Sequence, residues 1–303
     1  MSSRVAAIVV AYHPNRGQLA ELCGLLGQHA EVIVVDNTPL ADAPVPVEGV
    51  QWLSMRGNAG IAAAQNAGIR AALSLGAEAI AFFDQDSTPD AQLLPSLVAA
   101  LGQPPSGVAA PVCVDMRTGR EYPPFRFNRW GWANPAPAAG LPAPVQVDLI
   151  ISSGSMVAAD VFARAGLMEE AFFIDYVDLE WCIRCRQAGV PIRVVPSATM
   201  PHAIGNDVFE NGPFTTFVHS PVRAYYRLRN AFLLIRMAHV PRLYVLHEVA
   251  AALVHHLLQW RHSQDRRQHA RLGWRGLVDG LRGVRGKLAT DMTGNTSNQG
   301  AAS

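Results

Sequence analysis

Short apolar runs alternate with helical patterns through the first hundred residues. Each run is bounded by turn residues and suits one buried strand; the runs lie at 5–11, 32–35, 50–53 and 79–83. Between them, apolar residues recur with helical spacing at 18–29 and 61–75. Strands that alternate with helices predict a mostly parallel sheet, and strands that are apolar throughout predict helices on both of its faces. We therefore expect the nucleotide-binding half of an α/β domain.

The pattern becomes irregular in the middle of the chain. The stretch 119–144 is rich in Pro, Gly, Trp and Arg and has no sustained period. It separates a strand predicted near Val112 from another predicted at 149–157. We interpret this stretch as an insertion or an acceptor-side loop.

Regular patterns return in the last third. A helix is predicted at 179–188, ended by Gly189, and a strand follows at 192–195. Beyond Pro221 the chain is predicted to be helical. The expected organisation is one α/β domain, a C-terminal helical extension and a disordered polar tail, with bounds at 1–235, 236–287 and 288–303.

Composition narrows the class of protein. The chain has 303 residues, of which 50% are hydrophobic, enough for one large domain with an appendage. Its net charge of +1 lacks the basic excess of a nucleic-acid-binding protein, so no nucleic-acid partner is expected. Four cysteines are too few and scattered for a disulfide scaffold, and Cys182-x-x-Cys185 lies in a helical pattern without a second metal-binding pair. No export signal follows Met1, so we expect a cytoplasmic protein.

The strongest chemical signal is the pair Asp84 and Asp86, directly after the apolar run 79–83. If the strand continues, both carboxylates point the same way and can share one hard cation, which keeps open positions for phosphate oxygens. The alternative is that both acids only shape a turn before the next helix.

Two further groups lie where an α/β sheet places its ligands. Asp36 and Asn37 end the second predicted strand, where a carboxylate can accept from a ribose hydroxyl or a base N–H, or can simply shape a turn. The segment 56–60 then opens a helix, where Asn58 could cap the helix and face a nucleotide.

A second acidic cluster lies at 172–184. Glu180 and Arg184 are four residues apart on a helix and form a natural ion pair. Asp178 lies at the first turn, where the helix N-terminus stabilises its ionised form, so it can accept a proton or serve as a simple cap. His202 follows the last predicted strand and could help Asp86 to bind a metal or diphosphate. The segment 219–230 offers cations and hydroxyls that suit phosphate or an anionic headgroup, or a solvated helix face.

Together these motifs resemble family 2 glycosyltransferases of the GT-A fold, most closely their bacterial dTDP-rhamnosyltransferase branch. The likeness covers roughly residues 5 to 235, and it is carried by 9–12, 34–37, 57–68, 83–87, 173–181 and 223–230. Each motif is weak alone, and their order and spacing carry the assignment. The resemblance implies an α/β fold with a mostly parallel central sheet, plus the C-terminal helices.

The resemblance also implies roles for individual residues. Asp36 and Asp84 would hold the nucleoside, Asp86 would bind Mg²⁺ or Mn²⁺ on the diphosphate with help from His202, and Asp178 would activate the acceptor hydroxyl. Asp175 stays a rival base, because this chain has Val177 where many members carry Glu. The remaining donor-binding residues implied are Tyr12, Asn58, Gly60, Asn66 and Gln85. The acceptor-side or supporting residues implied are Ser153, Gly154, Glu180, Trp181 and Arg184.

The implied reaction is a single inverting displacement that moves a sugar, expected to be L-rhamnose from dTDP-rhamnose, to a hydroxyl of a cell-surface glycan or lipid-linked saccharide. Two alternatives remain, a nucleotidyltransferase and a non-catalytic module that binds a sugar nucleotide or glycan. A nucleotidyltransferase should carry a Gly-rich, basic triphosphate loop after its first strand, and no such loop is visible.

The C-terminal segment offers a membrane contact. The stretch 243–260 is strongly apolar, yet it contains three histidines and a glutamate and makes a poor spanning helix. The stretch 261–287 interleaves arginines with Trp and Leu, as in a helix that lies on an anionic membrane. A helical appendage that packs on the rest of the protein explains the same pattern. If lipid binds, the protein is expected at the inner face of the cytoplasmic membrane.

Overall fold

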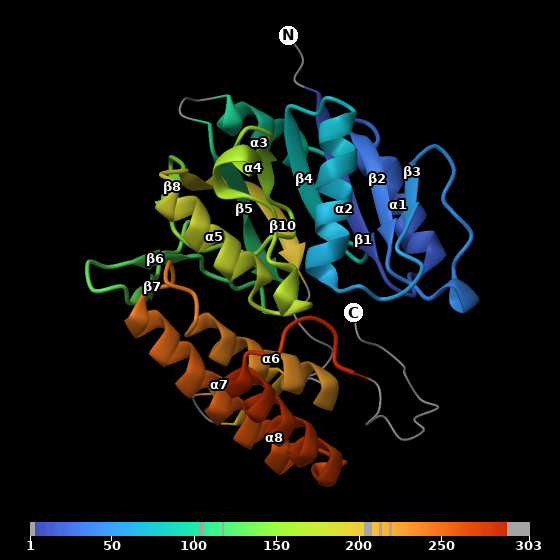
Figure 1. Ribbon diagram of the computed structural model, residues 1–303. Helices are drawn as coiled ribbons and strands as arrows, with labels where there is room; N and C mark the ends of the chain where they lie inside the picture. Colours follow the sequence, from blue (N-terminus) through green and yellow to red (C-terminus); the bar gives the residue numbers. More distant parts are fainter. Residues whose placement is uncertain are drawn as a thin grey trace. The chain divides into compact units, whose positions relative to one another are not determined.

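The protein forms two compact units in a computed structural model (Figure 1). The first unit is built from Met1–Glu169 and Val177–Ala203, and the second from Glu170–Tyr176 and Ile204–Ser303. The structure describes residues 4–102, 106–116, 118–202, 208–211, 214–217 and 220–289, with side chains from 202 to 219 not included. The domain bounds at 235 and 287 stay predictions, and the tail from residue 290 lies outside the described residues.

An eight-stranded sheet forms the centre of the first unit. Its order is β3-β2-β1-β4-β9-β5-β10-β8, and only β9 and β8 run antiparallel to their neighbours. The predicted mostly parallel α/β fold is therefore confirmed. The strands are β1 (Val5–Ala11), β2 (Glu31–Asp36), β3 (Gln51–Ser54), β4 (Ala79–Asp84), β5 (Val108–Asp115), β8 (Val145–Val147), β9 (Met156–Ala158) and β10 (Ile192–His202).

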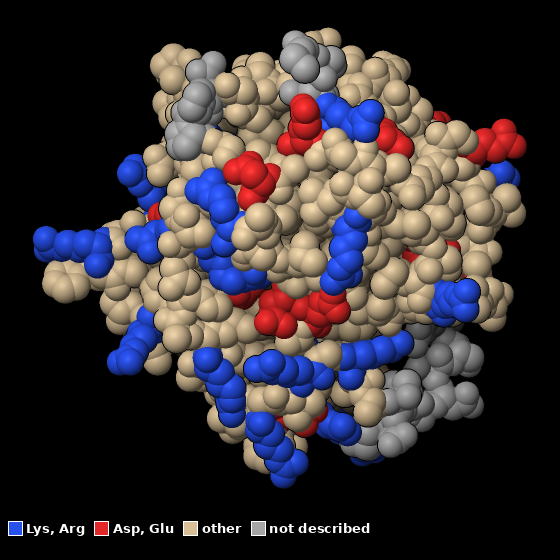
Figure 2. Space-filling model, turned by 45° about the horizontal axis from the view of Figure 1, so that its top comes forward, with Lys and Arg blue, Asp and Glu red and all other residues tan. Residues whose placement is uncertain are grey.

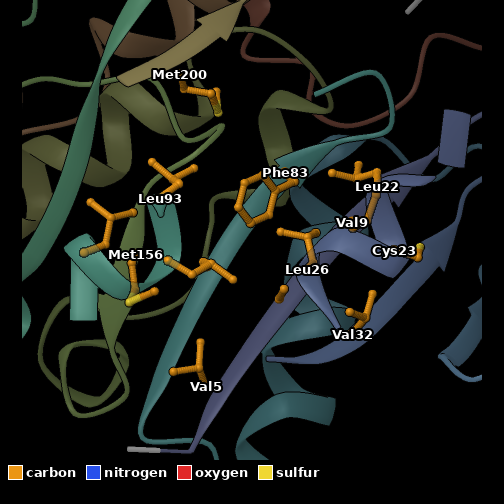
Figure 3. Packing of buried hydrophobic residues seen from close by; sticks show 14 of the residues in the cluster. Val5, Val9, Leu22, Cys23, Leu26, Val32, Phe83, Leu93, Met156 and Met200 are labelled. Atoms are coloured by element: carbon orange, nitrogen blue, oxygen red, sulfur yellow. The ribbon is translucent and has the colours of Figure 1, made fainter. Parts of the chain in front are cut away.

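Helices cover both faces of this sheet because alternate strand residues point to opposite sides. On one face, Val5, Ala7 and Val9 of β1 join a core with α1 and α3 (Figure 3). On the other face, Ile8 contacts Gly68 of α2, and Phe82 packs against Phe162 of α4. The helices are α1 (Arg16–Leu26), α2 (Ile61–Ser74), α3 (Leu93–Leu101), α4 (Val161–Ala165) and α5 (Val177–Gln187).

Local chemistry explains where several elements begin and end. The Asn15 side chain accepts from the N–H groups of Gly17 and Gln18, so α1 begins earlier than predicted. The strand predicted at 149–157 is wrong over most of its length, because only Met156–Ala158 is a strand. Gly154 has a φ of 79°, and this left-handed conformation breaks the extended run just before β9.

The irregular stretch 119–144 contains a small hairpin. Strands β6 (Phe125–Phe127) and β7 (Ala133–Pro135) pair antiparallel around a tip that Asn128 organises. The Asn128 side chain accepts from the N–H groups of Trp130 and Trp132 at 2.9 and 3.1 Å. The tip therefore has a defined shape and holds both tryptophans exposed.

The second unit is dominated by three helices: α6 (Pro221–Leu234), α7 (Arg242–His262) and α8 (Arg266–Arg282). Strands β11 (Val208–Asn211) and β12 (Phe214–Phe217) pair as a hairpin. Helix α8 approaches α6 closely at Gly276 and Gly280, where a Cβ atom would lie 2.7 Å from Tyr225 O and from Phe232 Cβ, respectively. Across the described residues, no helix is both long enough and apolar enough to pass through a bilayer.

We predict opposite effects for two Gly→Ala substitutions in the first unit. At Gly68 a Cβ would lie 2.6 Å from Cγ2 of the buried Ile8, so G68A should lower the free energy of unfolding by about 1–3 kcal/mol. Gly24 lies on the exposed side of α1, where a Cβ meets nothing within 4 Å, so G24A should raise the free energy of unfolding by up to about 1 kcal/mol. Urea unfolding of both variants checks this, and equal effects would contradict the packing of α2 on β1.

Candidate active site

The candidate residues gather at one edge of the sheet because β1, β2, β3 and β4 are parallel neighbours. Asp36 pairs in register with Ala11, and Asp84 pairs with Val10, so both carboxylates end strands on either side of β1. The chain leaves β1 at Tyr12, whose N–H donates to the Gln85 side chain at 2.6 Å. The strand order thus brings Tyr12, Asp36 and the pair Asp84–Gln85 to one edge of the sheet. Open α/β sheets bind their ligands at this edge.

Asp84 and Asp86 are not two positions of one strand, so the expected side-by-side arrangement on a strand is wrong. Strand β4 ends at Asp84, and the Ser87 N–H donates to the Asp84 carbonyl at 3.1 Å, which closes a turn. The Asp84 N–H in turn donates to Ser87 Oγ at 3.1 Å. The turn leaves Asp86 exposed and Asp84 half-buried.

Oxygen donors are available for a hard cation at this turn. Carboxylates are the ligands that Mg²⁺ and Mn²⁺ prefer, and an exposed Asp86 leaves room for phosphate oxygens, so the donor type fits the expected metal. Among the residues with described side chains, no three His, Cys, Asp or Glu are grouped to hold a metal by themselves. His202 ends β10, where its backbone pairs with Asp115. Its side chain is not among those that the structure describes, so its part in the metal site stays a prediction.

Asn37 organises the glycine-rich segment before α2, a role that the sequence analysis missed. Its Oδ1 accepts from the Ala59 N–H at 2.9 Å, and its Nδ2 donates to the Gly60 carbonyl at 3.2 Å. Asn58 Oδ1 accepts from the Gly60 N–H at 3.0 Å and contacts the same Asn37 amide. The predicted capping of α2 by Asn58 is wrong, because Gly60, with a φ of 90°, is the capping residue.

Asp36 itself is held by the turn that follows β2. Its Oδ1 accepts from the Thr38 N–H at 2.9 Å, and the residue is buried. Thr38 Oγ1 accepts from the His13 N–H at 3.0 Å, which ties the ends of β1 and β2 together. Asp36 therefore shapes this turn, and its part in nucleoside binding stays a prediction.

Ser153 and Gly154 lie just before β9, and Ser153 contacts the Asp84 turn. The Asp84 N–H donates to Ser153 Oγ at 3.4 Å, and Ser153 Oγ lies 3.2 Å from Ser87 Oγ. A Cβ on Gly154 would lie 2.4 Å from the sulfur of Met200, so only glycine fits. Ser153 thus braces the acidic turn, and Gly154 lets the chain pass close to Met200.

Glu180, Trp181 and Arg184 fasten α5 to the loop that follows α4. The predicted ion pair is confirmed: Arg184 donates to both Glu180 oxygens at 2.7 and 2.8 Å, and Glu180 is 1% exposed. Arg184 also donates to the carbonyls of Ala165 and Leu167 at 2.6 and 2.7 Å. Trp181 Nε1 donates to the Gly166 carbonyl at 2.8 Å. These three side chains therefore act as supports.

Asn66 fastens the same loop to α2. Its Nδ2 donates to the Met168 carbonyl at 2.9 Å, and its Oδ1 accepts from the Met168 N–H at 2.8 Å. The residue is 1% exposed. This pairing gives Asn66 a structural role in the fold, and donor binding by its side chain stays a prediction.

The two candidate bases differ in their surroundings. Asp178 is the second residue of α5, and its Oδ1 accepts from the Leu179 N–H at 2.9 Å, in the first turn as predicted. Asp175, in the second unit, forms an ion pair with Arg223 at 3.2 Å, and its side chain is 15% exposed. Asp175 therefore already serves as a partner for a cation.

Arg229 and Asn230 are not available for phosphate, which corrects that expectation for the 219–230 segment. Arg229 is 0% exposed and donates to the carbonyls of Ala171 and Phe172 at 3.1 and 2.8 Å. Asn230 Nδ2 donates to the carbonyls of Phe172, Ile174 and Asp175 at 3.0, 2.7 and 3.2 Å. The hydroxyl of Tyr225 likewise donates to Asp279 at 2.8 Å. The side chains of Arg229, Asn230 and Tyr225 therefore form hydrogen bonds within the second unit.

Two cysteines lie on α5. Cys182 and Cys185 are free, buried thiols, and burial raises the pKa of Cys185 to about 12. Burial thus disfavours the thiolate form that metal binding and redox chemistry use.

Comparison with known proteins decides the family. The sequence profile of Glycosyl transferase family 2 matches residues 18–135. The chain is 37% identical over 290 residues to dTDP-rhamnosyl transferase RfbF of Shigella flexneri, a match that covers 94% of this chain and 98% of the relative. The protein belongs to glycosyl transferase family 2. The resemblance to the rhamnosyltransferase branch is thereby confirmed.

Solved structures share the fold at low sequence identity. TarS 1–349 of S. aureus, solved with UDP-GlcNAc, has a TM-score of 0.55 at 15% identity, over 93% of this chain and 81% of that chain. GalNAc-T7, solved with UDP, GalNAc and Mn²⁺, has a TM-score of 0.54 at 12% identity, over 67% of this chain and 44% of that chain. This chain thus spans less than half of GalNAc-T7. The expected GT-A fold is confirmed, and the family makes this protein a glycosyltransferase in preference to the two alternatives.

We predict that this glycosyltransferase loses stability in R184K. A lysine makes a single contact with Glu180 and cannot also reach the carbonyls of Ala165 and Leu167, so the free energy of unfolding should fall by about 1–3 kcal/mol. The matched control is R164K, where the pair with Asp160 is exposed and 3.6 Å long, and the change should stay within about 0.5 kcal/mol. Denaturant unfolding compares the two, and equal losses would contradict the supporting role of Arg184.

Proposed function

We propose that the protein is an inverting, metal-dependent glycosyltransferase that moves L-rhamnose from dTDP-rhamnose to a hydroxyl of a saccharide or lipid-linked saccharide. One observation carries this proposal: the relative that matches along almost the whole chain is named for dTDP-rhamnosyl transfer. The gathering of Asp36, Asp84 and Asp86 at the carboxyl edge of the sheet supports a nucleotide-sugar donor.

The donor residues divide between nucleoside and diphosphate. Asp36 and Asp84 end β2 and β4 on either side of β1, and this position at the edge of the sheet suits a nucleoside. Tyr12 and Gln85, hydrogen bonded to each other, line the same edge. Asn58 and Gly60 precede α2, whose N-terminal N–H groups favour a negatively charged ligand.

Asp86, with His202 as a second candidate, would hold Mg²⁺ or Mn²⁺. When bound, such a cation offsets the negative charge that develops on the departing nucleoside diphosphate. The protein's contribution is to present Asp86 on a turn braced by Ser87 and Ser153, so that the carboxylate stays exposed.

Asp178 is the proposed general base. Its place in the first turn of α5 stabilises the carboxylate, which keeps it ready to accept a proton at neutral pH. The acceptor oxygen forms a bond to the anomeric carbon while its proton passes to Asp178. The bond from that carbon to the diphosphate oxygen breaks, and its electron pair leaves with dTDP, which inverts the configuration. Glu180, Trp181 and Arg184 fix α5 and so orient Asp178.

The test of the proposed function uses the full chain and a panel of sugar nucleotides. We expect dTDP-rhamnose with Mn²⁺ or Mg²⁺ to release dTDP faster than UDP-GlcNAc, UDP-glucose or GDP-mannose do. Faster turnover of another donor would overturn the choice of rhamnose. Release of pyrophosphate from a nucleoside triphosphate, without transfer from any sugar nucleotide, would overturn the whole proposal.

D86N should remove the metal dependence of donor binding. The substitution keeps the size of the side chain and removes the charge that attracts the cation. Calorimetry with dTDP-rhamnose, with and without Mn²⁺, should show a gain in affinity with Mn²⁺ for the wild type and none for D86N. The control D90N changes another exposed acid, four residues along, and should keep the gain. An Mn²⁺ effect preserved in D86N would refute its role.

D178N should lower kcat by about 10²-fold or more, because general base catalysis contributes on that scale. Donor affinity should stay close to that of the wild type, since Asp178 is assigned to the acceptor. D175N should have a much smaller effect on kcat. Single-turnover rates with a saccharide acceptor measure both variants, and the reverse order of effects would identify Asp175 as the base.

A further inference from the structure

Helix α7 presents an unpaired apolar face. Its exposed apolar residues recur at intervals of three and four, and we call them the α7 stripe: Leu243, Leu246, Ala250, Leu253, Leu257 and Trp260. Leu246 and Leu257 are 65% and 61% exposed. Large apolar side chains arranged in one continuous line on a surface indicate a binding partner.

The opposite side of α7 is the one that packs within the second unit. Tyr244, Val245, Ala252 and Gln259 are buried, and they lie across the helix from the stripe at about 100° per residue. The ring of His256 lies directly against Gly273 of α8, where a Cβ would be only 1.9 Å away. Because internal packing already uses this side, the α7 stripe is a second apolar face.

Basic residues accompany the stripe. Arg242 and Arg261 lie at its two ends, on the same side of the helix, and both are exposed. Nine Lys and Arg lie between 242 and 289, against three acids. One acid, Asp279, is buried and paired with Arg275, and another, Glu248, is largely buried beside His247. Figure 2 shows Lys and Arg side chains gathered over the C-terminal helices. The partner is therefore expected to carry negative charge.

A second copy of the chain does not meet this requirement. An antiparallel pair of stripes sets Arg242 opposite Arg261 of the other copy, and a parallel pair sets each arginine opposite itself. The stripe also runs for fewer than three heptads, which is short for a coiled coil. Like charges at both ends would oppose such pairing.

We propose that the α7 stripe lies on the surface of an anionic lipid bilayer. The leucines and Trp260 enter the boundary between headgroups and acyl chains, and Arg242 and Arg261 contact lipid phosphates. If the proposed function holds, this contact brings the enzyme to a lipid-linked acceptor, but lipid binding itself does not depend on the identity of the donor.

This proposal moves the expected membrane contact from 261–287 to α7. Helix α8 packs its glycines on α6, and Leu272 is buried in a cluster with Tyr225 and Tyr226. Removing 261 onward would therefore damage the second unit, so the test uses surface substitutions in the full chain.

Co-sedimentation with vesicles tests the proposal. The wild type should pellet at low salt with vesicles of phosphatidylglycerol and phosphatidylcholine, should pellet less with phosphatidylcholine alone, and should be released by salt. The double variant L246Q/L257Q should bind at least about tenfold more weakly, because two large apolar contacts are lost. The control L40Q/V45Q, with side chains 61% and 63% exposed in the first unit, should bind like the wild type.

A second variant, R242Q/R261Q, leaves every apolar contact in place and should weaken binding at low salt only. Circular dichroism and release of dTDP from dTDP-rhamnose monitor the fold and the donor site of each variant separately. Equal vesicle binding by L246Q/L257Q and the wild type, or no wild-type binding to anionic vesicles, would overturn the proposal. Sedimentation velocity that shows a wild-type dimer, converted to monomer by L246Q/L257Q without any vesicle binding, would assign the face to a second copy.

Discussion

The parallel alignment of β2, β1 and β4 is the constraint on which the candidate site depends. Backbone pairing holds Asp36 beside Ala11 and Asp84 beside Val10, and the chain leaves all three strands at the same edge. Polar side chains then shape that edge: Asn37 holds 58–60, and Ser87 and Ser153 brace the acidic turn. A slip of one residue would move every inward side chain to the other face and disperse the site.

The contacts of Glu180 and Trp181 show what these two adjacent residues of α5 do. Glu180, Trp181 and Arg184 together fasten α5 to the loop 165–168. Asn66 binds the same loop from α2. These contacts fix the helix that carries Asp178, the proposed general base, and a base must be held within hydrogen-bonding reach of its substrate.

The second unit uses a buried cation to hold a strained backbone. Phe173, Asp175 and Tyr176 all have a positive φ, a conformation that side chains other than glycine rarely adopt. Arg229 and Asn230 satisfy the carbonyls of this segment, and such pairing is what allows the conformation to persist. These two residues read as ligand-binding groups in the sequence, yet they stabilise the fold.

The sequence by itself determined the α/β class, the strands at 5–11 and 79–83, and the ion pair of Glu180 with Arg184, because each rests on local periodicity or helical spacing. It also placed Asp36 and Asp84 at strand ends. Only the tertiary structure decided that β4 stops at Asp84 and that Asn37 holds the 58–60 segment. The tertiary structure alone showed which apolar residues of α7 are buried and which are exposed. A tight turn after Asp84, hydrogen bonds between distant residues and burial against another helix decide these features, and none of them leaves a periodic signal in the chain.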